Sequence, residues 1–123
     1  MAAHSAQQER ITTMGTQFFE GLLTEARDSS TLSSRQKHDL LALLEAIGES
    51  LEKLAAENAE AAQSIRNFLA CAVFESTRRE RTSVLAATAR KGMLLAFRPY
   101  EDSHAHLVSM AYTLGDVLSA LGV

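Results

Sequence analysis

The feature that most constrains the fold is a long run of apolar residues in heptad spacing. Its apolar positions step by four and three residues, through Leu40, Leu44, Ile47, Leu51, Leu54, Ala61, Ile65, Phe68 and Ala72. This spacing predicts a helix that packs along another helix by knobs into holes. Asn58 occupies a polar position of the same register, within the stretch "AENAE". The pattern allows either one long helix from Leu40 to Ala72 or two helices that meet at this stretch.

Amphipathic segments are predicted on the N-terminal side of this run. Ser5 and Gln8 have the spacing of a capping box and predict the start of a first helix. One face of that helix would carry Ile11, Met14, Phe18 and Leu22. A turn-forming cluster, "RDSSTLSS", follows at residues 27–34. Ser33 and Gln36 repeat the capping-box spacing and predict the start of a second helix.

The C-terminal part begins with a junction. The stretch "STRRERTS" at residues 76–83 has no apolar residue, so a helix here would run through solvent or be interrupted. Apolar positions return at Val84, and Pro99 predicts a helix end because the residue before a proline disfavours the α region. Asp102 or Ser103 is the predicted N-cap of a last helix. Its apolar stripe would consist of Leu107, Ala111, Leu114, Leu118 and Leu121.

These segments predict an all-α fold, an antiparallel bundle of four to five helices with long coiled-coil-like seams, in one domain spanning residues 1–123. The composition agrees, since 46% of the residues are hydrophobic and there is a single proline. The longest unbroken apolar run, residues 68–74, is far shorter than the roughly 20 residues of a membrane span. No export signal is visible, and Cys71 is expected to be a buried thiol. We therefore expect a cytoplasmic protein without membrane insertion.

Residue patterns typical of catalysis or metal binding are weak. His104 and His106 are two residues apart, so on a helix their side chains diverge and cannot share one metal. A thiolate at Cys71 would be poorly stabilised among apolar neighbours. The six glycines are scattered singly and form no phosphate-binding loop. The sequence thus predicts a protein that is not an enzyme and uses no metal or cofactor.

Charge is distributed in blocks. Residues 66–98 hold seven Lys or Arg against two Asp or Glu, whereas residues 1–65 hold five against ten. Six residues of this basic block could bind phosphates of a nucleic acid, namely Arg78, Arg79, Arg81, Arg90, Lys91 and Arg98. Alternatively, the block could pair with the acidic second helix inside the molecule. The net charge of −3 and the lack of aromatic residues between the arginines make nucleic acid the less favoured partner.

The order of these parts resembles the FlgN-type flagellar export chaperones. The resemblance lies in "RQKHDLLALLEAI", with Lys37 before Leu40, Leu41 and Leu44, and in "IRNFLACAVFESTRRERTSVL". Tyr100 in "RPYEDS" also fits. The resemblance implies a small cytoplasmic helical protein that keeps a secreted flagellar subunit soluble by binding a helical segment of it. This chain departs from the family pattern at its C-terminus, where an amphipathic helix replaces a polar tail and could cover or form the groove.

The helix around Asn67 to Leu85 would then contribute the partner-binding residues. The predicted set is Asn67, Phe68, Leu69, Val73, Arg78, Arg79, Arg81, Val84 and Leu85. The first part of this segment would be packed, and the arginine-rich part would meet an acidic amphipathic partner helix. Two alternatives remain open: a nucleic-acid-binding regulator that uses the basic block, and a structural bundle that forms homo-oligomers through its seams.

Overall fold

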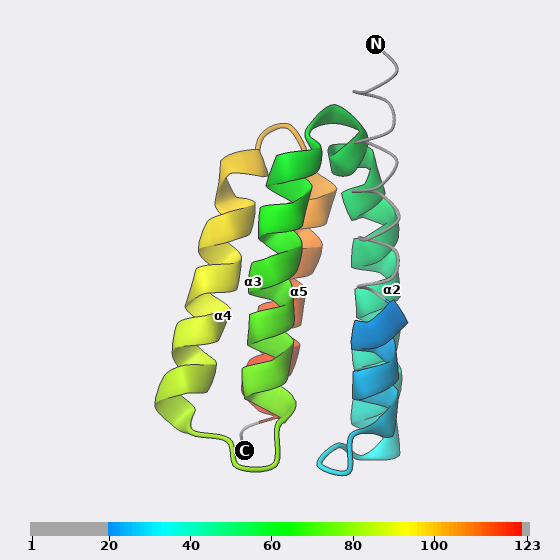
Figure 1. Ribbon diagram of the computed structural model, residues 1–123, viewed down its shortest axis with the longest axis vertical. Helices are drawn as coiled ribbons and strands as arrows, with labels where there is room; N and C mark the ends of the chain where they lie inside the picture. Colours follow the sequence, from blue (N-terminus) through cyan, green and yellow to red (C-terminus); the bar gives the residue numbers. More distant parts are fainter. Residues whose placement is uncertain (1–19, 122–123) are drawn as a thin grey trace.

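A computed structural model describes residues 20–121, and all regular structure in this range is helical (Figure 1). Residues 20–28 form a first helical segment. The elements that follow are α2 (Ser34–Glu57), α3 (Ala59–Thr77), α4 (Ser83–Phe97), the short 3-10 helix η1 (Arg98–Tyr100) and α5 (Ala105–Ala120). The predicted all-α fold is confirmed. The predicted helix start at Ser5 and the apolar positions Ile11, Met14 and Phe18 lie outside the described residues.

Helices α2 to α5 run alternately up and down and form an antiparallel bundle (Figure 1). Helix α3 packs against both α2 and α4, and α5 also packs against both of them. Helices α2 and α4 make no contact with each other and therefore occupy opposite corners of the bundle. Residues 20–28 run beside α2 on the side nearest the viewer in Figure 1. Within residues 20–121, none of the helices has both the length and the apolar character that crossing a membrane requires.

Helix α2 begins and packs as the sequence predicts. The amide nitrogen of Gln36 donates to Ser33 Oγ at 3.1 Å, and the amide nitrogen of Ser33 donates to Gln36 Oε1 at 2.9 Å. This is the predicted capping box, and it satisfies two of the free N–H groups near the helix start. The heptad positions of α2 are all in the core, namely Leu40, Leu44, Ile47, Leu51 and Leu54.

The chain reverses at Asn58, so the heptad run forms two helices rather than one. Asn58 Oδ1 accepts a hydrogen bond from the amide nitrogen of Ala61 at 3.0 Å and caps α3. Of the heptad positions predicted beyond this point, Ile65 and Ala72 are buried, at 1% and 0% exposure. The prediction is wrong at Phe68, which leaves the seam and is 46% exposed, while Leu69 takes a core position beside Ile65.

In the second half of the chain, the helices are interrupted where the sequence predicts, but the last helix does not begin at the predicted N-cap. Residues 78–82 are not helical, so the polar stretch interrupts the helices, and α4 ends at Phe97, two residues before Pro99. The predicted N-cap of the last helix is wrong, because His104 occupies the N-cap position of α5, without a capping hydrogen bond from its side chain. The hydroxyl of Ser103 contacts His104 Nδ1 at 3.0 Å instead of capping the helix backbone. The predicted stripe of α5 is buried in full.

Two contacts between distant parts of the sequence hold the ends of the bundle. At one end, Thr31 Oγ1 donates to the carbonyl oxygen of Thr77 at 2.7 Å, which joins the turn before α2 to the end of α3. At the other end, His104 Nε2 lies 3.0 Å from Glu57 Oε2, which joins the start of α5 to the end of α2. The long helices are thus fixed at their termini as well as along their seams.

Replacement of the α3 cap tests the reversal. We expect Asn58→Ala to lower the free energy of unfolding by about 1 kcal/mol, because the amide nitrogen of Ala61 loses its acceptor. The matched control is Asn67→Ala at an exposed position inside α3, where the higher helix propensity of alanine offsets the loss of the solvent-exposed hydrogen bond from Gln63 Nε2. Urea denaturation followed by circular dichroism measures both; equal losses would contradict a specific role of Asn58.

Candidate partner-binding site

Helix α4 buries few of its residues, although many of its side chains are apolar. Of its 15 residues, only Ala86, Met93 and Phe97 are buried. The large apolar side chains that are exposed in the described chain are Phe68 (46%), Phe74 (51%), Val84 (74%), Leu85 (48%), Leu95 (50%) and Tyr112 (39%). All but Tyr112 belong to α3 or α4. Clusters of exposed apolar side chains of this kind are typical of interaction surfaces.

Phe68 lies directly against α4. Its Cδ1 atom is 3.2 Å from the position that a Cβ on Gly92 would occupy, so the ring uses the space left by the missing side chain. This contact sets the register of the two antiparallel helices. Leu85 precedes Gly92 by two turns, and it therefore lies about 10.5 Å further along α4, near the level of Phe74 on α3.

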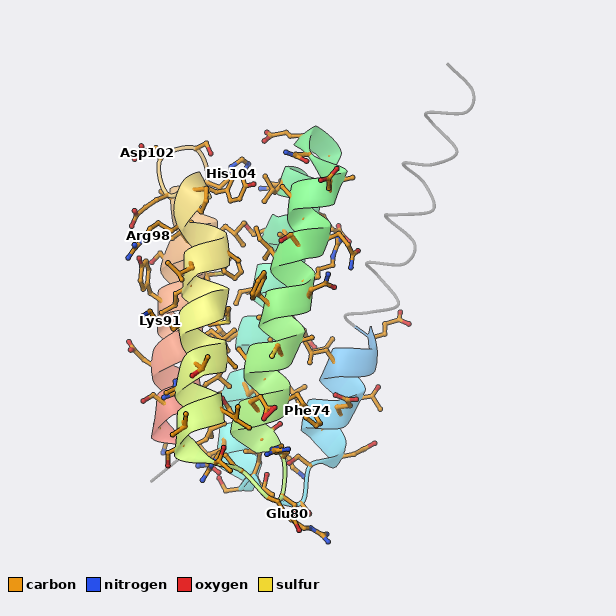
Figure 2. All side chains as sticks on the ribbon, turned by 60° about the vertical axis from the view of Figure 1, so that its left-hand side comes forward. Phe74, Glu80, Lys91, Arg98, Asp102 and His104 are labelled. Atoms are coloured by element: carbon orange, nitrogen blue, oxygen red, sulfur yellow. The ribbon has the colours of Figure 1, made fainter. Side chains whose placement is uncertain are left out.

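Cys71 is exposed, and the prediction that its thiol is buried is wrong. It lies three residues after Phe68 and three before Phe74, so it stands between them on the outer side of α3. Phe68 lies toward α4, whereas Figure 2 shows Phe74 on the lower part of α3, on the side toward residues 20–28. Residues 68–74 are apolar around the whole circumference of α3, whereas the bundle buries one side of them. We define the outer surface formed by Phe68, Cys71, Val84 and Leu85 as the α3–α4 face, and Phe74 is exposed beyond its edge.

The predicted partner-binding residues fall into two groups. Asn67, Phe68, Arg79, Val84 and Leu85 are exposed on or beside the α3–α4 face. Leu69 and Val73 are buried in the core, at 0% and 2% exposure, where they stabilise the bundle and offer no surface to a partner. Arg78 is half-buried, and its Nε lies 3.3 Å from Oε1 of Glu75 within the same turn.

Arg81 joins the ends of two helices. Its Nη1 donates to the carbonyl oxygen of Ser76 at 3.1 Å and to the carbonyl oxygen of Leu121 at 2.9 Å. These carbonyls belong to the C-terminal ends of α3 and α5, where free acceptors and the helix dipoles favour a positive charge. The geometry gives Arg81 a structural role, and sequence reasoning could not see it because Leu121 is forty residues away.

Of the remaining basic residues in the described chain, only Arg66 interacts with a carboxylate of the acidic helix α2. Arg66 is buried at 2% exposure, and burial lowers the pKa of its guanidinium, an effect that the nearby carboxylate of Glu52 opposes. Among the described residues, Arg90, Lys91 and Arg98 have no carboxylate within 4.0 Å. The alternative of intramolecular pairing with α2 is wrong for these three, because α2 and α4 occupy opposite corners.

A groove of about 370 Å³ lies between α4 and α5 on this basic side. It is lined by Ala87, Arg90, Lys91, Leu94, Leu95, Arg98 and Tyr112. We call it the α4–α5 groove. Sequence reasoning did not identify it, although Arg90, Leu94 and Arg98 stand four residues apart and hence on one side of a helix.

Residues 20–121 contain no group of three side chains placed to hold a metal ion. Comparisons of the chain with protein-family models, with curated proteins and with solved structures found no match. The argument about function therefore rests on the exposed apolar and basic surfaces of α3, α4 and α5.

Removal of the Arg81 side chain tests its structural role. We expect Arg81→Ala to lower the free energy of unfolding by about 1 kcal/mol, because two helix-terminal carbonyls lose a charged donor at a partly exposed site. Arg79→Ala, two residues away on the exposed turn, is the matched control and should leave stability unchanged. Thermal and urea denaturation compare the two; a stable Arg81→Ala variant would show that the contacts contribute nothing.

Thiol labelling tests the exposure of the α3–α4 face. We expect Cys71 to react with Ellman's reagent in the folded protein at close to the rate measured in denaturant, because its side chain is exposed. The Cys71→Ser variant gives the blank. A thiol that reacts only after unfolding would show that this surface is covered in solution.

Proposed function

We propose that this protein is a non-enzymatic binding protein that holds an amphipathic helical segment of another protein against the α3–α4 face. The observation that carries the proposal is the exposure of Phe68, Val84 and Leu85 on two packed helices. Their ring and branched side chains form an apolar surface on rigid elements. A partner helix that covers such a surface uses the helix-in-groove mode of recognition.

The exposed apolar side chains by themselves support only weak, reversible binding. Covering one half-exposed leucine or phenylalanine side chain gains on the order of 1 kcal/mol, so the face supplies about 3 to 4 kcal/mol before the entropic cost of association. A free energy of that size corresponds to a Kd of about 1 mM or weaker, so tighter binding requires further contacts along the partner helix. Weak binding of this kind suits a protein that must release its partner.

The most specific form of the proposal is an export chaperone that keeps a helical segment of a secreted, flagellar-type subunit soluble. Its support is the resemblance in the segment from Asn67 to Leu85, of which Asn67, Phe68, Val84 and Leu85 are exposed. The last helix, α5, leaves this surface open, because it packs on the other side of α4 and contacts α3 in the bundle interior. In this form the protein acts by covering apolar side chains and uses no cofactor.

A peptide-binding measurement tests the function. The probe is a fluorescein-labelled helical peptide of zero net charge with leucines at positions i, i+3, i+4 and i+7, followed by fluorescence anisotropy. We expect Val84→Glu combined with Leu85→Glu to weaken binding by at least about tenfold, because a carboxylate cannot be buried unpaired against leucine. Stability should change little, since both side chains are exposed.

The matched control is Ala42→Glu combined with Ala56→Glu, which adds the same charge at exposed positions of α2 on the opposite corner. It should bind the peptide like the unmodified protein. Equal binding by both double variants, or no binding of the peptide at all, would contradict the proposal.

A further inference from the structure

The α4–α5 groove combines an apolar floor with basic ends. Leu94 forms the floor, and its methyl carbons lie 3.7 Å from the position that a Cβ on Gly115 would occupy, which is van der Waals distance, so Leu94 packs over α5. Leu95 and Tyr112 stand along the groove with 50% and 39% of their surface exposed. A ligand that lies in the groove would therefore cover apolar surface from both helices.

The basic residues stand at the two ends of this floor. Arg90 and Lys91 are at one end and Arg98 is at the other, seven to eight residues along α4, which corresponds to about 11 Å. Figure 2 shows Lys91 and Arg98 on the same side of α4, one above the other. The carboxylates on neighbouring elements are Asp116 of α5 and the turn residues Glu101 and Asp102, and none lies within 4.0 Å of these cations.

We propose that the α4–α5 groove binds an acidic amphipathic helix whose two carboxylates are two turns apart, with large apolar side chains between them. The carboxylates would pair with Lys91 and Arg98, and the apolar side chains would cover Leu94, Leu95 and Tyr112. This site is on the opposite flank of α4 from Gly92, against which Phe68 packs, and it does not depend on the proposed function. It assigns a charge preference to a partner, which the α3–α4 face alone does not.

Other occupants match the groove less well. Helix α2 of a second copy offers Glu45 and Glu52 at the required spacing, but α2 exposes no large apolar side chain to fill the floor. An anionic amphiphile with one head group would use only one of the two basic ends. A nucleic acid would neutralise the cations but would leave the leucine floor without an apolar partner.

A charge-swap experiment tests the inference. The probe is a labelled helical peptide with glutamates at i and i+7 and leucines at i+3 and i+4, titrated with the full chain. We expect Lys91→Glu combined with Arg98→Glu to weaken its binding by about tenfold or more. A peptide with lysines in place of the glutamates should show the reverse order, with the variant binding it more tightly than the unmodified protein.

Two control variants separate this site from general charge effects and from the proposed function. Arg35→Glu combined with Lys37→Glu changes the net charge equally on α2 and should leave binding of the glutamate peptide unchanged. Cys71→Glu combined with Leu85→Glu, at two exposed positions of the α3–α4 face, should also leave it unchanged, so that the two sites can fail separately. Circular dichroism of each variant confirms that the helices are intact.

Several outcomes would overturn the inference. One is equal binding of glutamate and glutamine peptides, and another is equal binding when the glutamates are moved to i and i+5, on different sides of the helix. A third is tighter binding of a single-stranded oligonucleotide that the Lys91 and Arg98 substitutions abolish, which would assign the cations to phosphates. Displacement of the peptide by laurate below its micelle concentration would assign the groove to single-headed amphiphiles instead.

Discussion

The reversal of the chain at Asn58 is the constraint on which the rest of the structure depends. The hydrogen bond between Asn58 Oδ1 and the amide nitrogen of Ala61 starts α3 in the opposite direction to α2. Without this break the apolar run from Leu40 to Ala72 would form one long helix, with Phe68 on its seam. With it, Leu69 and Val73 enter the core of a short bundle and Phe68 turns outward. The exposed α3–α4 face is thus a consequence of where the helix ends.

The same reversal separates the charges of the molecule. Because the helices alternate in direction around the bundle, α2 and α4 occupy opposite corners and share no contact. The exposed carboxylates of α2, among them Glu45, Glu49 and Glu52, cannot reach the cations of α4. The residues of the basic block therefore differ in whether a neighbouring group holds them. Arg78 and Arg81 are held by neighbouring groups, whereas Arg90, Lys91 and Arg98 remain available along the α4–α5 groove.

Helix α4 connects the two proposed binding surfaces. Its buried stripe is narrow, and its flanks expose leucines toward α3 on one side and toward α5 on the other. One flank is apolar and lies beside the polar turn with Arg79, while the other has cations at both ends of an apolar floor. A partner helix on the first would be selected mainly by apolar contact, and a helix on the second by charge spacing. Gly92 allows the close packing of Phe68 that shapes the first of these flanks.

The sequence by itself determined the helices, most of their boundaries and the core of α2 and α5, because heptad spacing, the Ser33–Gln36 capping box and Pro99 act through neighbours a few residues away. It also predicted that Phe68, Val84 and Leu85 belong to one surface. Only the tertiary structure decided that Leu69 and Val73 are core, that Cys71 is exposed, that Arg81 reaches Leu121 and that α2 and α4 lie apart. These outcomes depend on how each helix is rotated and on which helices become neighbours, and spacing within one helix carries no information about either.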